Sequence, residues 1–219
     1  MTGRRIGILG GTLDPVHAGH LEAASVARTA LSLDLVQLMP SMTPPHRHLQ
    51  PQASPFHRFA MVALAVAERE RLLASDDELC TAGPSYTSDT LARWHGRGFA
   101  PTELFFVLGA DAFADIAAWY RYPAVLDSAH FVVVARPGTS LVELQSQLPA
   151  LRSRMCDGSS VTSESPGTPR IMLLSASTPD VSSTEIRRRV AAGEPLDGLT
   201  PPAVIAHIER HRLYKDRRQ

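Results

Sequence analysis

The sequence predicts an α/β protein, and three observations support this fold class. The first 28 residues predict a strand, a glycine-rich turn and a helix in succession. Further apolar runs of strand length follow, clearest at residues 104–108 and 130–135, with helix-forming segments between them. The 219 residues, 44% of them hydrophobic, are enough for one α/β domain with a sizeable core.

The opening segment predicts an anion site. Residues 6–9 are a short apolar run of the kind that forms a buried strand, and Gly10 and Gly11 follow directly. Without a Cβ, the two glycines let backbone N–H groups approach an anion closely. Residues 21–28 combine strong helix formers with apolar residues at helical spacing, so the positive end of a helix points to the same place.

Two histidines, His17 and His20, fall at the start of that helix, and their spacing puts them on one face. Backbone donors, a helix dipole and two imidazoles together predict a site for nucleotide phosphates. A Gly-Gly turn before a helix is also common without a ligand, and a histidine pair is often polar surface. The loop lacks the patterns of a P-loop and of the dinucleotide-binding fingerprint, and no cysteine stands near enough to complete a zinc site.

Composition narrows the classes of partner. The formal net charge is +0, so we expect no broad basic face and no nucleic-acid partner. Cys80 and Cys156 have no motif spacing and predict no disulfide framework. The N-terminal residues lack the apolar core of a signal peptide, and no apolar run could span a bilayer. We therefore expect a soluble, cytoplasmic protein without a membrane partner.

A proline-rich loop follows the second predicted strand, residues 35–39. The prolines of residues 41–48 exclude a helix or a central strand there. The loop carries His46 and Arg47 at the end of a strand, where α/β folds place ligands. Taken alone, this loop is better explained as solvated polar surface.

The next helix is predicted to begin at Ser54, with Pro55 at its first position. We expect its apolar stripe to extend to Leu72 and its solvated face to include Arg58. Residues 78–81 predict a short strand.

Residues 87–95 predict another helix, with Thr87 or Ser88 as its N-cap and a stop at Gly96. A capped helix start accounts fully for the serine and threonine content of this stretch. The nearby Tyr86 has no assigned role on this reasoning alone.

The strand at residues 103–108 is predicted to be central, because it is apolar after its first residue. It runs into Gly109 and Asp111. An aspartate at the carboxyl end of a central strand suits hydrogen bonds to ribose hydroxyls, and it equally suits an N-cap. The following helix is expected to end at Trp119 and Tyr120, where the tryptophan would ordinarily belong to the core or an interface.

The strand at residues 130–135 ends at Arg136. Residues 139–169 are polar and rich in Ser, Gln, Gly and Pro, and we expect a partly helical, variable excursion there. The run at residues 171–174 predicts the last strand.

Hydroxyl groups cluster at the start of the next helix. Ser182 and Glu185 form the pattern of a capping box. That pattern does not explain the further hydroxyls of Ser183 and Thr184 with Arg187 one turn on, a combination that suits a phosphate.

A final helix is predicted from residue 200 to Arg212. It places His207 and His211 one turn apart, a spacing that could bind a metal. With no third ligand in view, a surface pair is the preferred interpretation, and Leu213 and Tyr214 are expected to dock the tail.

Six motifs resemble those of bacterial nicotinate mononucleotide adenylyltransferases, in the nucleotidyltransferase superfamily, and occur in the same order. The first, residues 10–21, is similar to Gly-Gly-Thr-Phe-Asp-Pro-x-His-x-Gly-His-Leu, with Leu13 for Phe. Residues 44–47 are similar to Pro-Pro-His-Lys, with Arg for Lys. Residues 181–187 are similar to Ile-Ser-Ser-Thr-x-Ile-Arg, with Val for Ile. The other three are residues 85–90, residues 109–111 with 119–120, and residues 136–138.

The resemblance implies a doubly wound, Rossmann-like, mostly parallel sheet with helices on both faces. Residues 1–219 would form a single domain, with a variable excursion at about 139–169. The implied reaction is adenylyl transfer from ATP to nicotinate mononucleotide, giving deamido-NAD and pyrophosphate. Mg²⁺ would be bound mainly through the ATP phosphates, with no protein metal site, and the resemblance leaves a homo-oligomer open.

The resemblance also assigns roles to residues. It makes His17, His20 and Arg187 the catalytic residues. It assigns ATP binding to Gly10, Gly11, Thr12, His17, His20, Gly109, Asp111, Arg136, Ser182, Ser183, Thr184 and Arg187. It assigns mononucleotide binding to His46, Arg47, Tyr86, Thr87, Trp119 and Tyr120.

Two other classes of function stay open at this point. One is a sister nucleotidyltransferase acting on nicotinamide mononucleotide, phosphopantetheine or another phosphate ester, and residues 85–87 with Trp119 argue against it. The other is a non-catalytic nucleotide-binding protein. The intact set of His17, His20, Ser183 and Arg187 argues against that alternative.

Overall fold

A parallel sheet forms the centre of the computed structural model, which describes residues 4–45, 51–135, 141–158, 167–177 and 180–215. In these residues the sheet has seven strands in the order β3-β2-β1-β4-β5-β7-β6, and every neighbouring pair is parallel. The strands are β1 (Ile6–Gly11), β2 (Leu35–Pro40), β3 (Leu72–Ala74), β4 (Leu104–Gly109), β5 (His130–Ala135), β6 (Met155–Asp157) and β7 (Ile171–Ser175).

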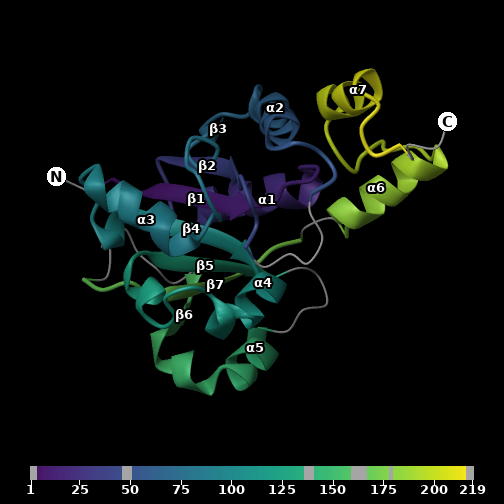
Figure 1. Cartoon of the computed structure of the whole chain (residues 1–219). Helices are drawn as coiled ribbons and strands as arrows, with labels where there is room; N and C mark the ends of the chain where they lie inside the picture. Colours follow the sequence, from purple (N-terminus) through teal and green to yellow (C-terminus); the bar gives the residue numbers. More distant parts are fainter. Residues whose placement is uncertain (1–3, 46–50, 136–140, 159–166, 178–179, 216–219) are drawn as a thin grey trace.

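Helices cover both faces of this sheet, as the resemblance implies. They are α1 (Ala18–Ala30), α2 (Pro55–Val66), α3 (Thr87–Gly96), α4 (Ala110–Ala114), α5 (Leu141–Gln147), α6 (Ser183–Ala192) and α7 (Pro202–Arg210). Short 3-10 helices span Pro101–Glu103, Ile116–Ala118, Ala124–Asp127 and Pro149–Arg154. Figure 1 shows α2 at the β3 end of the sheet with α7 beside it, and α5 at the β6 end.

The alternation of side chains along β4 explains the two layers of core. Phe105 and Val107 face a buried cluster that includes residues of α1, α2, α6 and α7. Leu104, Phe106 and Leu108 face a second cluster, which contains residues of α3 and α4. Both sets are buried because successive side chains of a strand point to opposite faces. The central position of β4, predicted from its apolar run, is confirmed.

Two local expectations are wrong. Residues 78–81 form turns and a bend rather than a strand, and the edge strand is β3, Leu72–Ala74, which begins at the expected end of the helical apolar stripe. The helix itself, α2, ends at Val66, and Leu72 pairs in register with Val36 of β2. Pairing with a neighbouring strand overrides the helical spacing of a three-residue apolar run.

Two segments on the other side of the sheet also differ in detail. The single helix expected after Gly109 is divided into α4 and the 3-10 helix Ile116–Ala118. Residues 139–169 are partly helical as predicted, through α5 and a 3-10 helix, and they also contribute the edge strand β6. We infer a single domain, because one sheet takes strands from residue 6 to residue 175.

Arg58 is buried, which contradicts its expected place on the solvated face of α2. Its side chain is fully enclosed, and its guanidinium donates to the carbonyl oxygens of Thr12 at 2.6 Å, Ser41 at 2.7 Å and Ala53 at 3.3 Å. These carbonyls belong to the loop after β1, to the residue that follows β2 and to the residue before the N-cap of α2. One buried cation therefore fixes three segments around the carboxyl ends of the first two strands.

Replacing Arg58 with methionine should lower the free energy of unfolding by about 3–5 kcal/mol, because several buried carbonyls would lose their donor. Methionine keeps much of the volume, so the loss reports hydrogen bonding rather than a large cavity. Urea unfolding measures it, with Arg69→Met, an exposed position just after the same helix, as the control. Equal stability of the two variants would contradict this role.

The C-terminal tail closes over the loop after β1, as expected from Leu213 and Tyr214. The Tyr214 hydroxyl donates to Oδ1 of the buried Asp14 at 2.8 Å. The same carboxylate accepts from the backbone N–H groups of Gln52 at 2.9 Å and Ala53 at 3.1 Å. Burial raises the pKa of Tyr214, so this hydroxyl stays a donor. The tail therefore holds Asp14 in position.

Candidate active site

A cavity of about 650 Å³ opens at the carboxyl ends of β1 and β4. These two strands are neighbours at the point where the strand order reverses, the usual ligand position in doubly wound sheets. Gly10 and Gly11 from β1 and Gly109 from β4 line it. The cavity therefore lies where the sequence predicts a nucleotide site.

His17 and His20 lie together at the positive end of α1. Their rings stack with centroids 3.7 Å apart, and both line the cavity. His17 is the N-cap residue, and its backbone N–H donates to Nδ1 of His20 at 3.3 Å. This bond places the proton of a neutral His20 on Nε2, which makes Nε2 a donor. The first turn of α1 contains no acidic residue, so the site favours an anion.

Two glycines leave room for this arrangement. A Cβ on Gly19 would lie 3.1 Å from Nδ1 of His17, and a Cβ on Gly10 would lie 3.1 Å from the ring of Phe106. Both distances are tighter than ordinary contacts of a Cβ. The glycine between the two histidines therefore lets the ring of His17 pack against the helix start.

The opposite part of the cavity combines a helix N-terminus with aromatic rings. Tyr86 is the N-cap residue of α3 and makes no side-chain capping bond, so the expectation that Thr87 or Ser88 caps this helix is wrong. Thr87 is already the first helical residue, and Ser88 is buried. First-turn N–H groups that are not capped by a side chain suit a ligand carboxylate.

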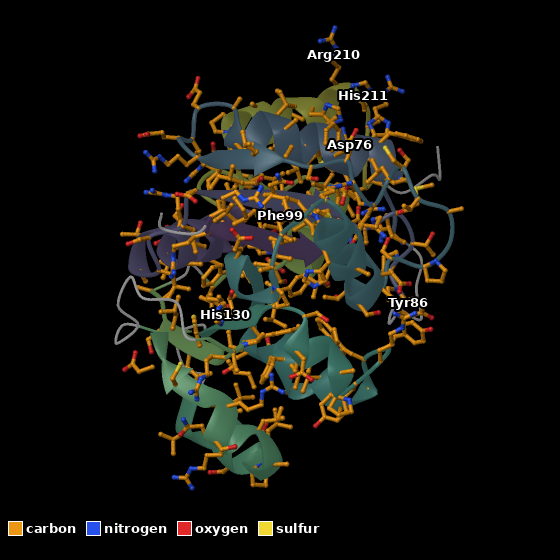
Figure 2. The ribbon with its side chains drawn as sticks, turned by 90° about the vertical axis from the view of Figure 1, so that its left-hand side faces the viewer. Asp76, Tyr86, Phe99, His130, Arg210 and His211 are labelled. Atoms are coloured by element: carbon orange, nitrogen blue, oxygen red, sulfur yellow. The ribbon has the colours of Figure 1, made fainter. Side chains whose placement is uncertain are left out.

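Aromatic side chains flank this helix start. The rings of Tyr86 and Tyr120 lie 4.5 Å apart, and Trp119 packs edge-on against Phe106 with centroids 6.1 Å apart. Tyr86, Trp119 and Tyr120 all line the cavity. Figure 2 shows Tyr86 near one edge of the molecule in that view, and the neighbouring Tyr120 is exposed.

Glu78 is a buried acid of the cavity that the sequence reasoning missed. It is 5% exposed, and its Oε1 accepts from the Thr90 hydroxyl at 2.6 Å. Burial raises the pKa of Glu78, although hydrogen bonds from Thr90 and Ser85 oppose this effect. A raised pKa favours the neutral acid, which lessens repulsion of a carboxylate ligand nearby.

Glu78 should make the protein less stable as pH rises. Its pKa in the folded protein lies above that of the unfolded chain, so between the two values the folded state binds more protons. The favourable contribution is complete below the unfolded value and is lost as pH rises through the folded value. Glu78→Gln carries no titrating proton, so it should lose less stability than the native protein as pH rises above 4.5, the usual pKa of a glutamate.

Urea unfolding across this pH range measures the slope for each protein. Glu70→Gln is the matched control, because the Glu70 side chain is 89% exposed. We expect the control to follow the native slope. If the free energy of unfolding of Glu78→Gln changed with pH as steeply as that of the native protein, Glu78 would not titrate as described.

The hydroxyl cluster of α6 lies against the loop after β1. Ser182 caps α6 by accepting from the N–H of Glu185 at 3.1 Å, as predicted. Ser183 donates to the carbonyl of Pro15 at 2.9 Å and lines the cavity. Arg187 donates to the carbonyl of Asp14 at 2.6 Å, so in this structure it holds the loop.

The structure gathers most of the predicted site residues around one cavity. The lining includes Gly10, Gly11, Thr12, His17, His20, Tyr86, Thr87, Gly109, Asp111, Trp119, Tyr120 and Ser183. Ser182, Thr184 and Arg187 stand beside it without belonging to its lining. The predicted residues His46, Arg47 and Arg136 lie outside the described residues.

Comparison with known proteins agrees with this geometry. The cytidylyltransferase-like family model matches residues 8–189. A protein of Roseiflexus sp. (strain RS-1) named "Probable nicotinate-nucleotide adenylyltransferase" is 41% identical over 98% of this chain and 100% of its own length. A protein of the same name from Pseudomonas aeruginosa PAO1 is 39% identical, over 97% of this chain and 98% of its own.

The fold is also found among solved structures. The Plasmodium falciparum nicotinic acid mononucleotide adenylyltransferase complexed with NaAD superimposes with a TM-score of 0.70 at 16% identity, covering 96% of this chain and 97% of that one. None of the described helices has the length and apolar character needed to cross a membrane. Sequence identity over nearly the whole chain, the family model and the fold agree, and the chain belongs to the nicotinate-nucleotide adenylyltransferases of the cytidylyltransferase-like family.

Proposed function

We propose that this protein transfers the adenylyl group of ATP to nicotinate mononucleotide, giving deamido-NAD and pyrophosphate in NAD biosynthesis. One observation carries the proposal: a single cavity joins the histidine pair at the start of α1 to the helix start and rings at Tyr86, Thr87 and Trp119. The first end suits phosphates and the second suits a flat ring with a carboxylate. Relatives about 40% identical carry the corresponding enzyme name.

The reaction needs positioning more than it needs a protein nucleophile. A phosphate oxygen of the mononucleotide forms a bond to the α-phosphorus of ATP, in line with the bond that breaks. The bridging oxygen leaves with its electron pair as part of pyrophosphate. The attacking group is already an anion, so His17 and His20 act by holding the phosphates and stabilising the developing charge.

Contacts to ATP are assigned to the carboxyl ends of β1 and β4, beside the two histidines. The backbone of Gly10, Gly11 and Thr12 would receive phosphate oxygens, and Asp111 at the end of β4 would accept from ribose hydroxyls. Arg136 is proposed to lie near the adenine.

The β- and γ-phosphates are assigned to the start of α6. Ser182, Ser183 and Thr184 would supply hydroxyl and backbone donors, and Arg187 would supply charge. Because Arg187 already donates to the Asp14 carbonyl, a contact with phosphate would couple ATP binding to the loop after β1.

Mononucleotide binding is assigned to the other end of the cavity. Tyr86 and Thr87 present the N-terminus of α3 to the nicotinate carboxylate, and Trp119 stacks on the ring, with Tyr120 beside it. His46 and Arg47 are proposed to contact the mononucleotide from the loop after β2.

The described cavity lining fits a magnesium ion that is bound mainly through ATP. Its acidic residues are Glu78, Asp111 and Asp115; Glu78 is buried with a raised pKa, and the other two are exposed. Such a lining offers few anionic ligands, so phosphate oxygens and water would complete the coordination. When bound, the ion neutralises charge on the phosphates.

A pyrophosphate-release assay with several acceptors tests the proposal. ATP is supplied with nicotinate mononucleotide, nicotinamide mononucleotide or phosphopantetheine, and CTP is supplied with the same acceptors. We expect release to be fastest with ATP and nicotinate mononucleotide. Faster release with phosphopantetheine or with CTP would assign the chain to a sister activity, and no release with any pair would favour a binding protein.

A further inference from the structure

Three histidines meet outside the active-site cavity, where α7 packs on α2. His57 comes from the first turn of α2, and His207 and His211 lie one turn apart at the end of α7. One ring nitrogen from each lies within 4.8 Å of those of the others. Nδ1 of His57 and Nε2 of His207 are 3.1 Å apart. The sequence shows only the pair on α7, because His57 is 150 residues away from His207.

The spacing of these nitrogens is close to that of metal ligands. A tetrahedral zinc ion with bonds of about 2.0–2.1 Å separates its ligand nitrogens by about 3.3–3.4 Å. The His57–His207 pair is already near this separation. The His211 ring lies 4.4 Å from that of His207 and 4.8 Å from that of His57, measured between centroids. Because His211 is exposed, its side chain can rotate toward the other two nitrogens.

Burial and charge favour the form of histidine that binds metal. A metal needs the neutral imidazole. Burial lowers the pKa of His207, and the neighbouring His211 and His57 lower it further. The last turn of α7 also presents the negative end of a helix dipole to His207 and His211, which favours a bound cation. His57 lies at the N-terminus of α2, and the positive end of that helix dipole disfavours a bound cation. The affinity for the metal must therefore come from direct ligation by the three imidazoles.

We propose that His57, His207 and His211 bind a zinc ion that joins α7 to α2. Three imidazoles leave the fourth tetrahedral position to water. The site lies outside the cavity lining, and Figure 2 shows His211 beside Arg210 at one end of the molecule, well away from Tyr86. The ion would be structural, and the adenylyl-transfer proposal does not depend on it.

A metal here would stabilise the tail that holds the active-site loop. His211 is the C-cap of α7, and Tyr214, three residues later, donates to the buried carboxylate of Asp14. Asp14 in turn fixes the backbone of Gln52 and Ala53, just before α2. The hydrogen bonds through Asp14 thus connect the chain just after α7 to the chain just before α2. Zinc would add a second connection between the same two helices.

Zinc binding can be measured directly on the full chain. Protein treated with EDTA and dialysed is titrated with Zn²⁺, and separately with Co²⁺, whose visible absorption reports a tetrahedral site. We expect one equivalent to bind with a Kd of about 1 μM or tighter. His211→Ala should weaken binding by at least about 100-fold, because it removes one of three ligands. His211 is exposed, so this variant should fold normally.

Three further variants separate this site from other histidines. His95→Ala removes a histidine of α3, and His20→Ala removes one of the cavity; both should keep the native stoichiometry and affinity. His211→Cys should retain binding and add a thiolate-to-cobalt charge-transfer band, since thiolate is a zinc ligand. Loss of binding in His20→Ala, or unchanged affinity in His211→Ala, would overturn the proposal.

Thermal unfolding gives a second readout that is independent of activity. At a Zn²⁺ concentration of about 100 times Kd, the melting temperature should rise by about 5–10 °C. EDTA should reverse the rise, and His211→Ala should show none of it. No detectable zinc binding by the native protein, or an equal rise in His211→Ala, would mean that the three histidines form only a hydrogen-bonded cluster.

Discussion

Replacing His20 with alanine is expected to leave the fold intact and to lower kcat for adenylyl transfer by about two orders of magnitude or more. His20 lies at the start of α1, half-buried in the cavity lining, with its Nδ1 accepting from the N–H of His17. Its Nε2–H is thus available as a donor, and we propose that it stabilises the charge that develops on the transferring phosphoryl group. Alanine removes that donor and also the acceptor of the His17 N–H, but it is a strong helix former, so we expect α1 to form.

Steady-state release of pyrophosphate from ATP and nicotinate mononucleotide measures the effect. Circular dichroism and the melting temperature establish that the variant is folded. His95→Ala is the matched control, because His95 lies on α3 and contacts the carbonyl of Phe99 rather than the cavity. Near-normal turnover of a well-folded His20→Ala protein would show that His20 is not catalytic.

The second large effect concerns the choice between nicotinate and nicotinamide mononucleotide. We expect kcat/KM to favour the acid by at least about 100-fold, equivalent to about 2.7 kcal/mol. The two substrates differ by one negative charge on the ring substituent. The start of α3 offers N–H groups without a side-chain cap and the positive end of a dipole, and burial raises the pKa of the nearby Glu78. The acid in the first turn, Asp89, forms an ion pair with Arg121 at 3.8 Å.

Trp119→Ala should lower kcat/KM for both mononucleotides by a similar factor, because stacking does not distinguish their charges. The ratio of kcat/KM for the acid to kcat/KM for the amide should therefore be the same in Trp119→Ala as in the native protein. Equal kcat/KM values for acid and amide in the native protein, or a preference for the amide, would show that the carboxylate site is misassigned.

The sequence predicted those parts of the structure that depend on local pattern. The buried strand expected at residues 103–108 and the capped start of α6 at Ser182 follow from an apolar run and from capping residues. The structure confirms both, with the strand shifted by one residue to Leu104–Gly109. The resemblance carried by the motifs implied the doubly wound order of the sheet. The structure has this order, and it places His17, His20 and Trp119 around one cavity.

The failures involve contacts between distant segments. Arg58 has the helical position of a surface residue, yet its donors meet carbonyls from the loop after β1 and the end of β2. Glu78 has no motif, and only the fold buries it against Thr90. The histidine cluster combines His207 and His211 of the α7 end with His57 of α2. Local sequence spacing could not show that His57 lies beside the other two.

The helix caps show a subtler limit. Thr87 and Ser88 have the residue types of an N-cap, but α3 begins after Tyr86 and makes no side-chain capping bond. At a binding site, the N–H groups of a helix start can be left for the ligand, so the strongest local propensity gives the wrong residue.

The central claim is that this chain joins ATP to nicotinate mononucleotide in the cavity at the ends of β1 and β4. Mass spectrometry of a reaction that contains only the protein, ATP, Mg²⁺ and nicotinate mononucleotide tests it most directly. We expect deamido-NAD and pyrophosphate to form in equal amounts, and both to fall together in His20→Ala. Absence of the dinucleotide with the native protein, or equal formation of it by His20→Ala, would contradict the account.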